Sequence, residues 1–402
     1  MVCKKNISKV FKSNTAAFAA VLLLVSVFLT GCAGRESTQT ETQPQATAEA
    51  TVVVPDVMET EPVVSMKKVA MITDFGSVTD GYVNQACWQG VENWCGSHQI
   101  PCIFYEPAED TEAERLLCVT RAIAEGADTV VLSGYLFGPV LAMVRDVYPD
   151  VTFLAIDVAA EDLTLDYTTV YEPGDNMTCL TFREEQIGYL AGYAAVMEGY
   201  RKLGFLGAME VTGVFNTGYG FIQGADAAAK ELGVDIEINY AYANQYFGSS
   251  ALTSVMEKWY QSGIEVVFSC GGGIYSSVIE AAKEYGGKVI GFETDQADLD
   301  PCVITSGIKN YQAATEMALQ YIRDGRWTEL GGKALRLSLT DADCMGLADG
   351  SDSWRLENFT VESYRAVKNS MAAGAIRINT GDRAAKPMVS EFTTVQYLNE
   401  SK

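Results

Sequence analysis

The sequence is poor in the residues that most metal and hydrolytic sites need. Its 402 residues include one histidine, His98, and none of its ten cysteines forms a C-x-x-C pair. Zinc sites are built from histidines and closely spaced cysteines, so we expect no metal site. The chain also lacks G-x-S-x-G and H-E-x-x-H motifs, which leaves hydrolysis without a catalytic constellation. We therefore expect no catalytic residues, no enzyme activity and no cofactor.

Basic residues are scarce as well. The chain has 29 Lys and Arg against 52 Asp and Glu, which gives a formal net charge of −23 at pH 7. Nucleic acids and anionic lipid headgroups repel such an acidic protein, so we expect no nucleic-acid partner. A small neutral or cationic ligand in a cleft remains compatible with this charge.

The N-terminal apolar run is too short for a membrane-spanning helix. The segment AAFAAVLLLVSVFLTG begins at Ala16, and residues 1–31 carry four lysines but no Asp or Glu. A span needs about 20 apolar residues, so residues 1–31 are interpreted as an export signal peptide. The segment Leu29-Thr30-Gly31-Cys32 resembles the lipobox of bacterial lipoproteins, which predicts lipidation of Cys32 and a lipid anchor on the extracytoplasmic face of the cell membrane. The alternative is an uncleaved anchor with an incidental cysteine.

Residues 32–65 continue from Cys32 as a predicted disordered tether. The stretch AGRESTQTETQPQATAEATVVVPDVMETEPVVS is rich in Thr, Glu, Gln and Pro and shows no helical or strand period before its Val runs. It has too little apolar surface to offset the entropy of ordering.

Eight cysteines remain after Cys3 and Cys32 are set aside. Most of them lie in apolar runs such as PCIFY and VVFSC, where small buried hydrophobic residues are expected. Disulfides are compatible with an exported protein, but the sequence fixes no pairing.

From Met66 onward, short apolar runs alternate with longer segments of helical period. KVAMITD (68–74) has the pattern of a strand, and Thr111 with Glu114 has the spacing of a capping box at a helix start. The alternation restarts after TFREEQ (181–186). Strands that are apolar on both faces and alternate with helices predict two parallel sheets, each covered on both sides. The predicted lobes are residues 66–181 plus about 308–330, and residues 182–307 plus about 331–385.

Open α/β sheets bind ligands outside the carboxyl ends of their strands. The candidate residues that follow predicted strands are Asp74, Glu106, Ser133, Gly134, Asp157, Gly271 to Gly273, Glu293 and Asp295.

A family resemblance runs through most of this region. MITDFGSVTDGYVNQACWQG (71–90) resembles the D-x-G-x-x-x-D-x-S-F-N-Q-x-x-W-x-G opening of the basic membrane protein family, the PnrA-like nucleoside-binding lipoproteins of ABC transporters. Further similar segments follow in the family's order: TFREEQIGYLAGYAA (181–195), FLGAMEVTGVF (205–215), GFIQGADAA (220–228), FSCGGGIYSSVIEAAKEYG (268–286), VIGFETDQADLDPCVITSGIK (289–309) and CMGLADG (344–350).

The resemblance implies a type I periplasmic-binding-protein fold, in which two doubly wound parallel-sheet lobes close about a hinge over a small ligand. It implies capture of a nucleoside, a purine nucleoside above all, or a similar polar solute for delivery to an ABC transporter permease. Carried over by position, Asp74 accepts hydrogen bonds from the base, Asp295 binds two ribose hydroxyls and Lys309 donates to the sugar. Gly271 and Gly272 let the backbone approach the ligand, and Asn84 belongs to the same motif as Asp74.

Three positions depart from the family pattern. Val83 stands where the family has the Phe of S-F-N, Thr217 where it has a second aromatic residue, and Pro139 where it often has Asp. Because stacking on a base contributes about 1–3 kcal/mol, other rings must replace these two or the ligand differs. The candidate replacements are Tyr82, Tyr135, Phe137, Phe215 and Tyr219.

A second hypothesis keeps the fold but not the transport. In it, the chain is a ligand-sensing surface lipoprotein. A nucleoside-cleaving enzyme ranks last, because the sequence offers no catalytic constellation.

Overall fold

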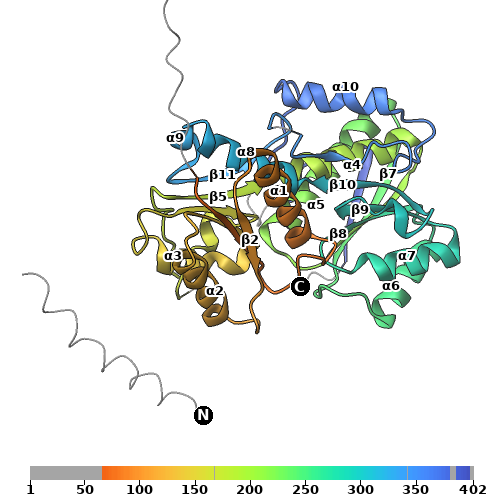
Figure 1. Ribbon diagram of the computed structural model, residues 1–402. Coiled ribbons are helices and arrows are strands. Elements are labelled where there is room, and N and C mark those ends of the chain that lie inside the picture. Colours follow the sequence, from red (N-terminus) through yellow and green to blue (C-terminus); the bar gives the residue numbers. More distant parts are fainter. Residues whose placement is uncertain (1–65, 167, 342, 381–385, 399–402) are drawn as a thin grey trace, which may run out of the picture. The chain divides into compact units, whose positions relative to one another are not determined.

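The computed structural model describes residues 66–166, 168–341, 343–380 and 386–398 (Figure 1). The predicted signal peptide, the tether and Cys32 lie outside the described residues. Within the described part, the strands form two sheets, and every strand pair but one is parallel.

The first sheet has the strand order β11-β5-β4-β3-β1-β2. Its strands are β1 (Val69–Ile72), β2 (Cys102–Tyr105), β3 (Thr129–Ser133), β4 (Thr152–Ile156), β5 (Met177–Phe182) and β11 (Lys333–Leu337). The helices around it are α1 (Val83–His98), α2 (Glu112–Ala124), α3 (Gly138–Val144), α8 (Tyr311–Arg323) and α9 (Trp327–Leu330), with the short 3-10 helices η2 (Tyr135–Phe137) and η3 (Ala160–Asp162).

Both faces of the central strands β1, β3, β4 and β5 are buried, which accounts for their continuous apolar sequences. Val69 and Met71 belong to the core cluster that contains the α1 residues Cys87 and Val91. Ala70 and its neighbours in alternation belong to a second cluster with residues of α2 and α3. Because side chains alternate across a strand, one run of apolar residues serves both layers of helices.

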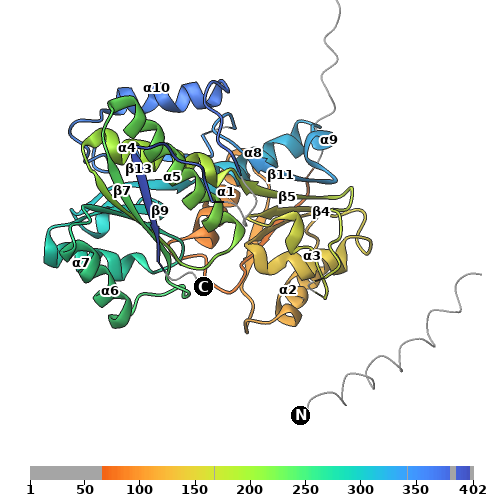
Figure 2. The same ribbon diagram turned by 180° about the vertical axis from the view of Figure 1, so that it is seen from behind.

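The second sheet has the order β12-β10-β9-β8-β6-β7-β13. Its strands are β6 (Lys202–Gly207), β7 (Ile236–Tyr242), β8 (Val266–Cys270), β9 (Lys288–Glu293), β10 (Val303–Lys309), β12 (Met345–Leu347) and β13 (Thr393–Tyr397). The helices on this side are α4 (Glu184–Glu198), α5 (Thr212–Leu232), α6 (Ser250–Gln261), α7 (Tyr275–Tyr285), η4 (Ala297–Leu299) and α10 (Val361–Ala372). Strand β12 is antiparallel to β10, and β13 lies beside β7 at the other edge (Figure 2).

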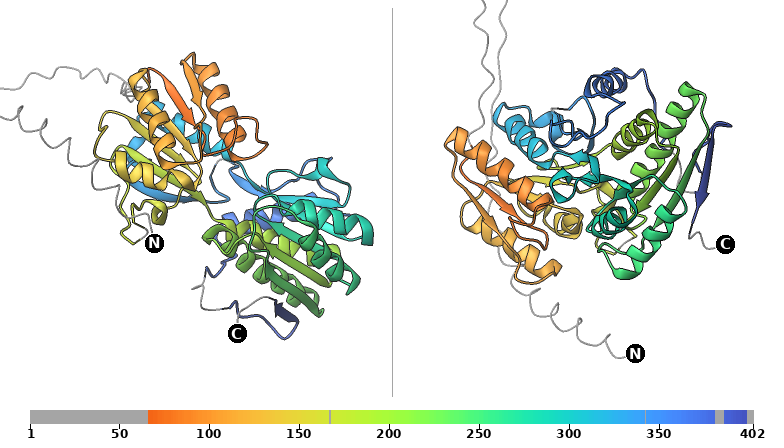
Figure 3. Two further views of the ribbon diagram at one scale, coloured as in Figure 1. Left: turned by 90° about the horizontal axis from the view of Figure 1, so that it is seen from below. Right: turned by 90° about the vertical axis from the view of Figure 1, so that its right-hand side faces the viewer.

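The two faces of the second sheet also pack against different groups of helices. Phe205 and Phe268 share a core cluster with α4 and α5 residues such as Ala191 and Ala225. Val267 belongs to a separate cluster with residues of α6 and α7. The two groups of strands, orange to yellow and green to teal, are seen from further sides in Figure 3.

The chain crosses between the two sheets three times. The crossings follow β5 at Arg183, β10 at Asn310 and β11 after Leu337. Hydrogen bonds tie them together: Arg183 N donates to Leu337 O at 2.8 Å, and Asn310 N donates to Cys344 O at 2.7 Å. Residues 333–337, which the sequence analysis assigns to the second lobe, pair as β11 with β5 of the first sheet. The third crossing therefore comes after Leu337.

Local signals in the sequence match the start of α2. Thr111 Oγ1 accepts a hydrogen bond from Glu114 N at 3.2 Å, so the predicted N-cap is present. No disulfide joins any two of the eight cysteines of the described residues, and all but Cys102 are buried. No helix among the described residues has both the length and the apolar character needed to cross a membrane.

Candidate functional site

A cleft with a volume of about 1050 Å³ lies at the carboxyl ends of strands from both sheets. Its walls include residues at or just after the ends of strands of both sheets, among them Asp74, Gly134, Asp157, Gly271 and Glu293. The strand-end candidates from the sequence are thus mostly gathered in one place. Glu106 is an exception, since its carboxylate accepts hydrogen bonds from Ser77 Oγ at 2.8 Å and Val78 N at 3.0 Å instead of lining the cleft.

Asp74 is held in place by one of its two carboxylate oxygens. Its Oδ1 accepts hydrogen bonds from Phe75 N at 2.6 Å, Gly76 N at 3.2 Å and Asn84 Nδ2 at 2.9 Å. Its Oδ2 accepts no hydrogen bond from the residues that the structure describes. Asp74 therefore presents a fixed acceptor to the cleft.

Asn84 orients Asp74 from below the surface of the cleft. Its side-chain oxygen accepts hydrogen bonds from Asp74 N at 3.2 Å and from Ser133 Oγ at 2.5 Å, and its Nδ2 also donates to Asp80 Oδ2 at 2.8 Å. Asn84 is buried and is not among the residues that line the cleft. The structure places it as a support for Asp74.

Gly134 leaves room for the Asp74 carboxylate. Its backbone has φ +100°, a region that favours glycine. A Cβ atom on this residue would lie 2.8 Å from Asp74 Oδ2. Any larger side chain would therefore push against the carboxylate as well as strain the backbone.

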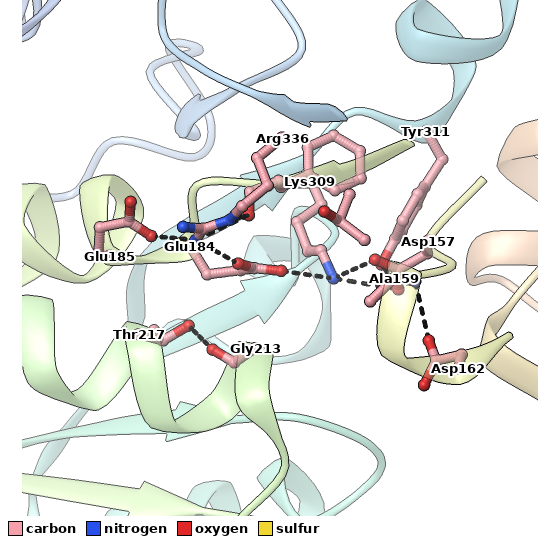
Figure 4. Close-up of polar contacts among 12 residues, drawn as sticks. Asp157, Ala159, Asp162, Glu184, Glu185, Gly213, Thr217, Lys309, Tyr311 and Arg336 are labelled. Atoms are coloured by element: carbon pink, nitrogen blue, oxygen red, sulfur yellow. Dashed lines mark hydrogen bonds and ion pairs between the residues drawn. The ribbon is translucent and has the colours of Figure 1, made fainter. Parts of the chain in front are cut away.

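A second part of the cleft lining is a charged cluster centred on Lys309 (Figure 4). Lys309 Nζ donates to Asp157 Oδ1 at 2.8 Å and Oδ2 at 3.1 Å, and lies 3.7 Å from Glu184 Oε1. Burial alone would lower the pKa of Lys309, but the carboxylates of Asp157, Glu184 and Glu293 raise it above its ordinary value. Lys309 is therefore a cation held by three surrounding acids.

The pKa values of two of those acids are also raised. Burial raises the pKa of Glu184 above its ordinary value, and the charge of Lys309 opposes this shift. The pKa of Glu293 is raised for the same reasons, burial first.

Three charged residues of this cluster lie close to the crossings between the sheets. Glu184 follows the first crossing, Lys309 precedes the second, and Arg336 is in the strand before the third. Arg336 Nη2 lies 3.4 Å from Glu184 Oε2 and also pairs with Glu185. One line of ion pairs, Arg336 to Glu184 to Lys309 to Asp157, thus runs through the hinge segments (Figure 4).

Two acids of the cluster have unusual backbone conformations. Asp157 has φ +58° and Glu293 has φ +73°, and each follows or ends a strand at the cleft. Non-glycine residues seldom adopt such angles, and those that do concentrate at functional sites. This geometry marks Asp157 and Glu293 as candidate ligand-binding residues.

Tyrosine hydroxyls bridge the cleft between the lobes. The hydroxyl of Tyr82, before α1, lies 2.6 Å from that of Tyr275, the first residue of α7. Burial raises the pKa of Tyr82, and this hydrogen bond raises it further. Burial also raises the pKa of Tyr135, with a further contribution from the hydroxyl of Tyr246 in the other lobe. Tyrosine hydroxyl groups therefore form contacts between the two lobes.

The structure divides the predicted site residues into two groups. Those that line the cleft are Asp74, Tyr82, Tyr135, Gly271, Gly272 and Lys309. Those that do not are Asn84, Phe215 and Asp295. Phe215 is buried in α5, where its ring packs against Tyr219. The Asp295 carboxylate accepts hydrogen bonds from Ala297 N at 3.1 Å and from Ser353 Oγ, outside the cleft.

Several lining residues were missed by the motif comparison. Glu293 and Asp157 follow strands, so the strand-end rule finds them although the resemblance assigns the sugar to Asp295. The rings of the cleft include Tyr246, Phe247, Tyr275, Phe292 and Tyr311 as well as Tyr82 and Tyr135. Of the other proposed replacements for the family's rings, Phe137 and Tyr219 are buried outside the lining.

A comparison with protein-family models decides the family. The model described as ABC transporter substrate-binding protein PnrA-like matches residues 67–380. The chain belongs to this family. The match covers every strand but β13 and all the residues that line the cleft, and it confirms the resemblance predicted from the motifs. Members of this PnrA-like family are described as substrate-binding proteins of ABC transporters.

Individual relatives are more distant. Basic membrane protein B of Borreliella burgdorferi is 32% identical over 233 residues, which cover 56% of this chain and 64% of the relative. The chain therefore spans less than two thirds of that relative's length. The CD4+ T-cell-stimulating antigen of Listeria monocytogenes is 25% identical over 337 residues, covering 77% of this chain and 87% of the relative. The ABC transporter nucleoside-binding protein BmpA of Lactococcus lactis is 24% identical over 242 residues, covering 57% and 64%.

Solved structures confirm the predicted fold. An ABC transporter solute-binding protein from Aeropyrum pernix K1 superposes with a TM-score of 0.61 at 20% identity, covering 79% of this chain and 95% of that chain. One from Conexibacter woesei gives 0.62 at 20% identity, covering 78% and 99%. This PnrA-like chain thus has the type I periplasmic-binding-protein fold, with two parallel-sheet lobes.

Proposed function

We propose that the protein is an extracytoplasmic solute-binding protein of an ABC transporter that captures a nucleoside, preferably a purine nucleoside, and delivers it to a permease. The observation that carries this proposal is the cleft, whose lining includes both the fixed acceptor on Asp74 and the acid-and-lysine cluster around Lys309. A nucleoside has complementary parts, because its base carries N–H donors and its sugar carries hydroxyl groups. The nucleoside-binding relative from Lactococcus lactis supports the same ligand class.

In the proposed pose, the base lies toward Asp74 and the sugar toward Lys309. The open Oδ2 of Asp74 accepts from a base N–H. Glu293 offers carboxylate oxygens that accept hydrogen bonds from sugar hydroxyls, while Lys309 donates a hydrogen bond to the sugar. Glu293 thereby takes the role that the family resemblance assigns to Asp295. The rings of Tyr82 and Tyr135 supply the apolar faces against which a base packs.

Capture works by closure about the three crossings. A ligand that contacts Asp74 in one lobe and Glu293 in the other binds the closed form better than the open form. It shifts the equilibrium toward closure by that difference in affinity. The tyrosine pair Tyr82 and Tyr275 adds a contact that exists when the lobes are together.

The proposal includes attachment to the outer face of the cell membrane. Cys32, in its lipobox, would carry the lipid, and residues 33–65 would tether the lobes to the membrane. The permease would then recognise the closed form.

Thermal unfolding of the full chain, freed of copurifying solutes, tests the ligand. A nucleoside present at 100 times its dissociation constant should add about 2.7 kcal/mol of stability, seen as a higher melting temperature. A flat response across purine and pyrimidine nucleosides would refute the nucleoside assignment. Transport is tested separately by deleting the gene in the source cell, since unchanged import of the bound solute would favour the sensing hypothesis.

A further inference from the structure

Two cysteines of the first lobe lie together although they belong to different elements. Cys95 is in the last turn of α1, and Cys102 is the first residue of β2. The Cys95 thiol donates a hydrogen bond to the sulfur of Cys102. Cys102 also packs against the core cluster that contains Cys95. The two sulfur atoms are therefore neighbours in the folded protein.

The turn between α1 and β2 holds these two residues close to each other. Gln99, just after the end of α1, has φ +57°, the left-handed conformation in which many helices end. Ile100 N donates to Cys95 O at 3.0 Å, which folds the chain back over the helix end. Cys102 then pairs in register with Val69 of β1, a residue of the same core cluster. Backbone hydrogen bonds and core packing thus fix the positions of both thiols.

The two thiols differ in how readily they can react. Cys95 is fully buried, whereas Cys102 is only partly buried. Burial raises the pKa of Cys95 to about 12. Burial also raises the pKa of Cys102, but the hydrogen bond from Cys95 opposes that rise. Because the thiolate is the reactive form of cysteine, Cys102 is the thiol that an oxidant in solution reaches and that attacks it.

A covalent link at this place would secure an exposed part of the first sheet. Strand β2 is at the edge of that sheet, where it pairs with β1 alone among the strands of the described residues. Phe104 of β2 is 39% exposed. Edge strands are open to pairing with other chains, and a bond from Cys102 to Cys95 would tie this one to α1.

We propose that Cys95 and Cys102 form a redox-dependent disulfide that fastens strand β2 to the end of helix α1. The thiol pair described above is the reduced form of this site. Neither cysteine lines the cleft, so the inference does not depend on which ligand the protein captures. The proposed extracytoplasmic location is a setting in which disulfides form and persist.

The oxidant in this reaction is a small disulfide, for which glutathione disulfide is the probe. The Cys102 thiolate attacks one sulfur of the probe, forming a mixed disulfide and releasing one glutathione thiolate, which takes up a proton. Cys95 loses its proton to solvent, attacks the Cys102 sulfur and releases the second glutathione. Two protein thiols are thereby oxidised to one disulfide, and one glutathione disulfide is reduced to two thiols.

Peptide mass spectrometry on the full chain tests the pairing. The native protein is equilibrated with equal concentrations of reduced and oxidised glutathione, quenched with acid, unfolded and alkylated. Cleavage after Glu92 and Glu109 then releases residues 93–109, whose only cysteines are Cys95 and Cys102. We expect more than about 90% of this peptide to be lighter by two hydrogen atoms than its reduced form and to carry no alkyl group. A peptide with two alkyl groups, or with one alkyl group and one glutathione, would overturn the inference.

Serine variants test the order of attack. Cys95→Ser removes the thiol that resolves the mixed disulfide, so we expect glutathione to accumulate on Cys102. Cys102→Ser should leave Cys95 without glutathione, because that thiol is buried. Cys118→Ser, which replaces a buried cysteine of α2, is the control and should form the disulfide as fully as the wild type. Glutathione on Cys95 in the Cys102→Ser variant would overturn the assignment of Cys102 as the attacking thiol.

Thermal unfolding measures what the link contributes to the fold. A disulfide restricts the unfolded chain, and this gain depends only weakly on the length of the loop that it closes. We expect the oxidised wild type to melt at least about 3 °C above the reduced protein. Cys102→Ser should melt at the same temperature with and without the oxidant. An unchanged melting temperature in the wild type would refute the fastening of β2 to α1. None of these measurements needs a ligand, so a failure of the nucleoside assignment would leave them unaffected.

Discussion

The ammonium group of Lys309 and the carboxylate of Asp157 form an ion pair that joins the two sheets. Nζ lies 2.8 Å from Oδ1 and 3.1 Å from Oδ2, and the side chain of Lys309 is only 6% exposed. Lys309 ends a strand of the second sheet, and Asp157 follows a strand of the first. Tyr311, just past the same crossing, donates to Asp157 Oδ2 at 3.2 Å. The ion pair therefore lies beside a crossing between the sheets and also in the lining of the cleft.

Replacing Lys309 by Met should destabilise the fold strongly. The change leaves the acids Asp157, Glu184 and Glu293 close together without their shared cation. Breaking a buried ion pair by removing one partner typically costs about 3–5 kcal/mol. The free energy of unfolding in denaturant measures this loss. Lys258→Met, at an exposed position of α6, should change it by less than about 0.5 kcal/mol, and similar losses in both variants would contradict the assigned role.

Two neighbouring acids give a second prediction about the ligand. Glu293→Gln should weaken nucleoside binding by about 1.5–3 kcal/mol, because it removes a charged hydrogen-bond acceptor from the cleft. Asp295→Asn should leave the affinity nearly unchanged, since Asp295 lies outside the cleft and bonds to Ala297 and Ser353. Calorimetry on both variants decides between them. The reverse ranking would restore the role that the family resemblance assigns to Asp295.

Gly134→Ala should weaken ligand binding through Asp74. The substitution costs about 1–2 kcal/mol in backbone strain at positive φ, and its Cβ would press on Asp74 Oδ2. Gly126 has a similar φ of +93° but open space around a Cβ, so Gly126→Ala carries the strain alone. We expect both variants to lose stability and only Gly134→Ala to lose nucleoside affinity, by about tenfold or more. If both variants bound the nucleoside equally well, Asp74 would not be the residue that binds the base.

The phenol pair across the cleft should act as one unit. Tyr82→Phe and Tyr275→Phe each remove the same interlobe hydrogen bond, which should weaken closure and ligand affinity by about 0.5–1.5 kcal/mol. The double variant should lose no more than either single variant, and a thermodynamic cycle measures this coupling. Tyr242→Phe, which breaks a 2.8 Å hydroxyl contact with Tyr240 inside the second lobe, is the control. Additive losses would mean that the two rings act independently.

Stability should depend on pH through Asp162 in a defined direction. Burial raises the pKa of Asp162 to about 6 from an ordinary value of 3.8. The native state therefore binds this proton more tightly than the unfolded chain, so the stability that Asp162 contributes falls as pH rises from about 4 to 6. The difference in unfolding free energy between wild type and Asp162→Asn should decrease across that window and be constant above it.

Asp166 provides a control of opposite sign. Backbone hydrogen bonds from Thr169 and Thr168 lower the pKa of Asp166 to about 2. Its contribution is present above about pH 4 and is lost as pH falls toward 2. The difference between wild type and Asp166→Asn should accordingly shrink on acidification, and slopes of the same sign in both variants would contradict the two assignments.

The fold follows from the sequence because its signals are local and repeated. Apolar runs such as VAMI in β1 and the capping box at Thr111 each predict their element without knowledge of the rest of the chain. The sequence analysis places residues 333–337 in the second lobe, whereas they form β11 of the first sheet, and their charged, largely exposed sequence KALRL carries no signal for either sheet. Its place as an edge strand beside β5 is a tertiary outcome.

The site is less predictable, because backbone conformation decides which side chain faces the cleft. Glu293 and Asp295 are two residues apart, and position in a motif does not tell which one the turn directs inward. The φ of +73° at Glu293 re-aims the chain there, and Asp295 then joins the turn before η4. The hydrogen bond between Tyr82 and Tyr275 of the other lobe could not be predicted from the sequence either, because 193 residues separate the two.

The late position of β11 has a consequence for how a newly made chain matures. Synthesis proceeds from the N-terminus, so the strands β6 to β10 of the second sheet all emerge before the last strand of the first sheet exists. Until Leu337 has left the ribosome or export channel, β5 is an unprotected sheet edge, open to mispairing with other chains. A chaperone that shields nascent polypeptides would find one such exposed sheet edge there.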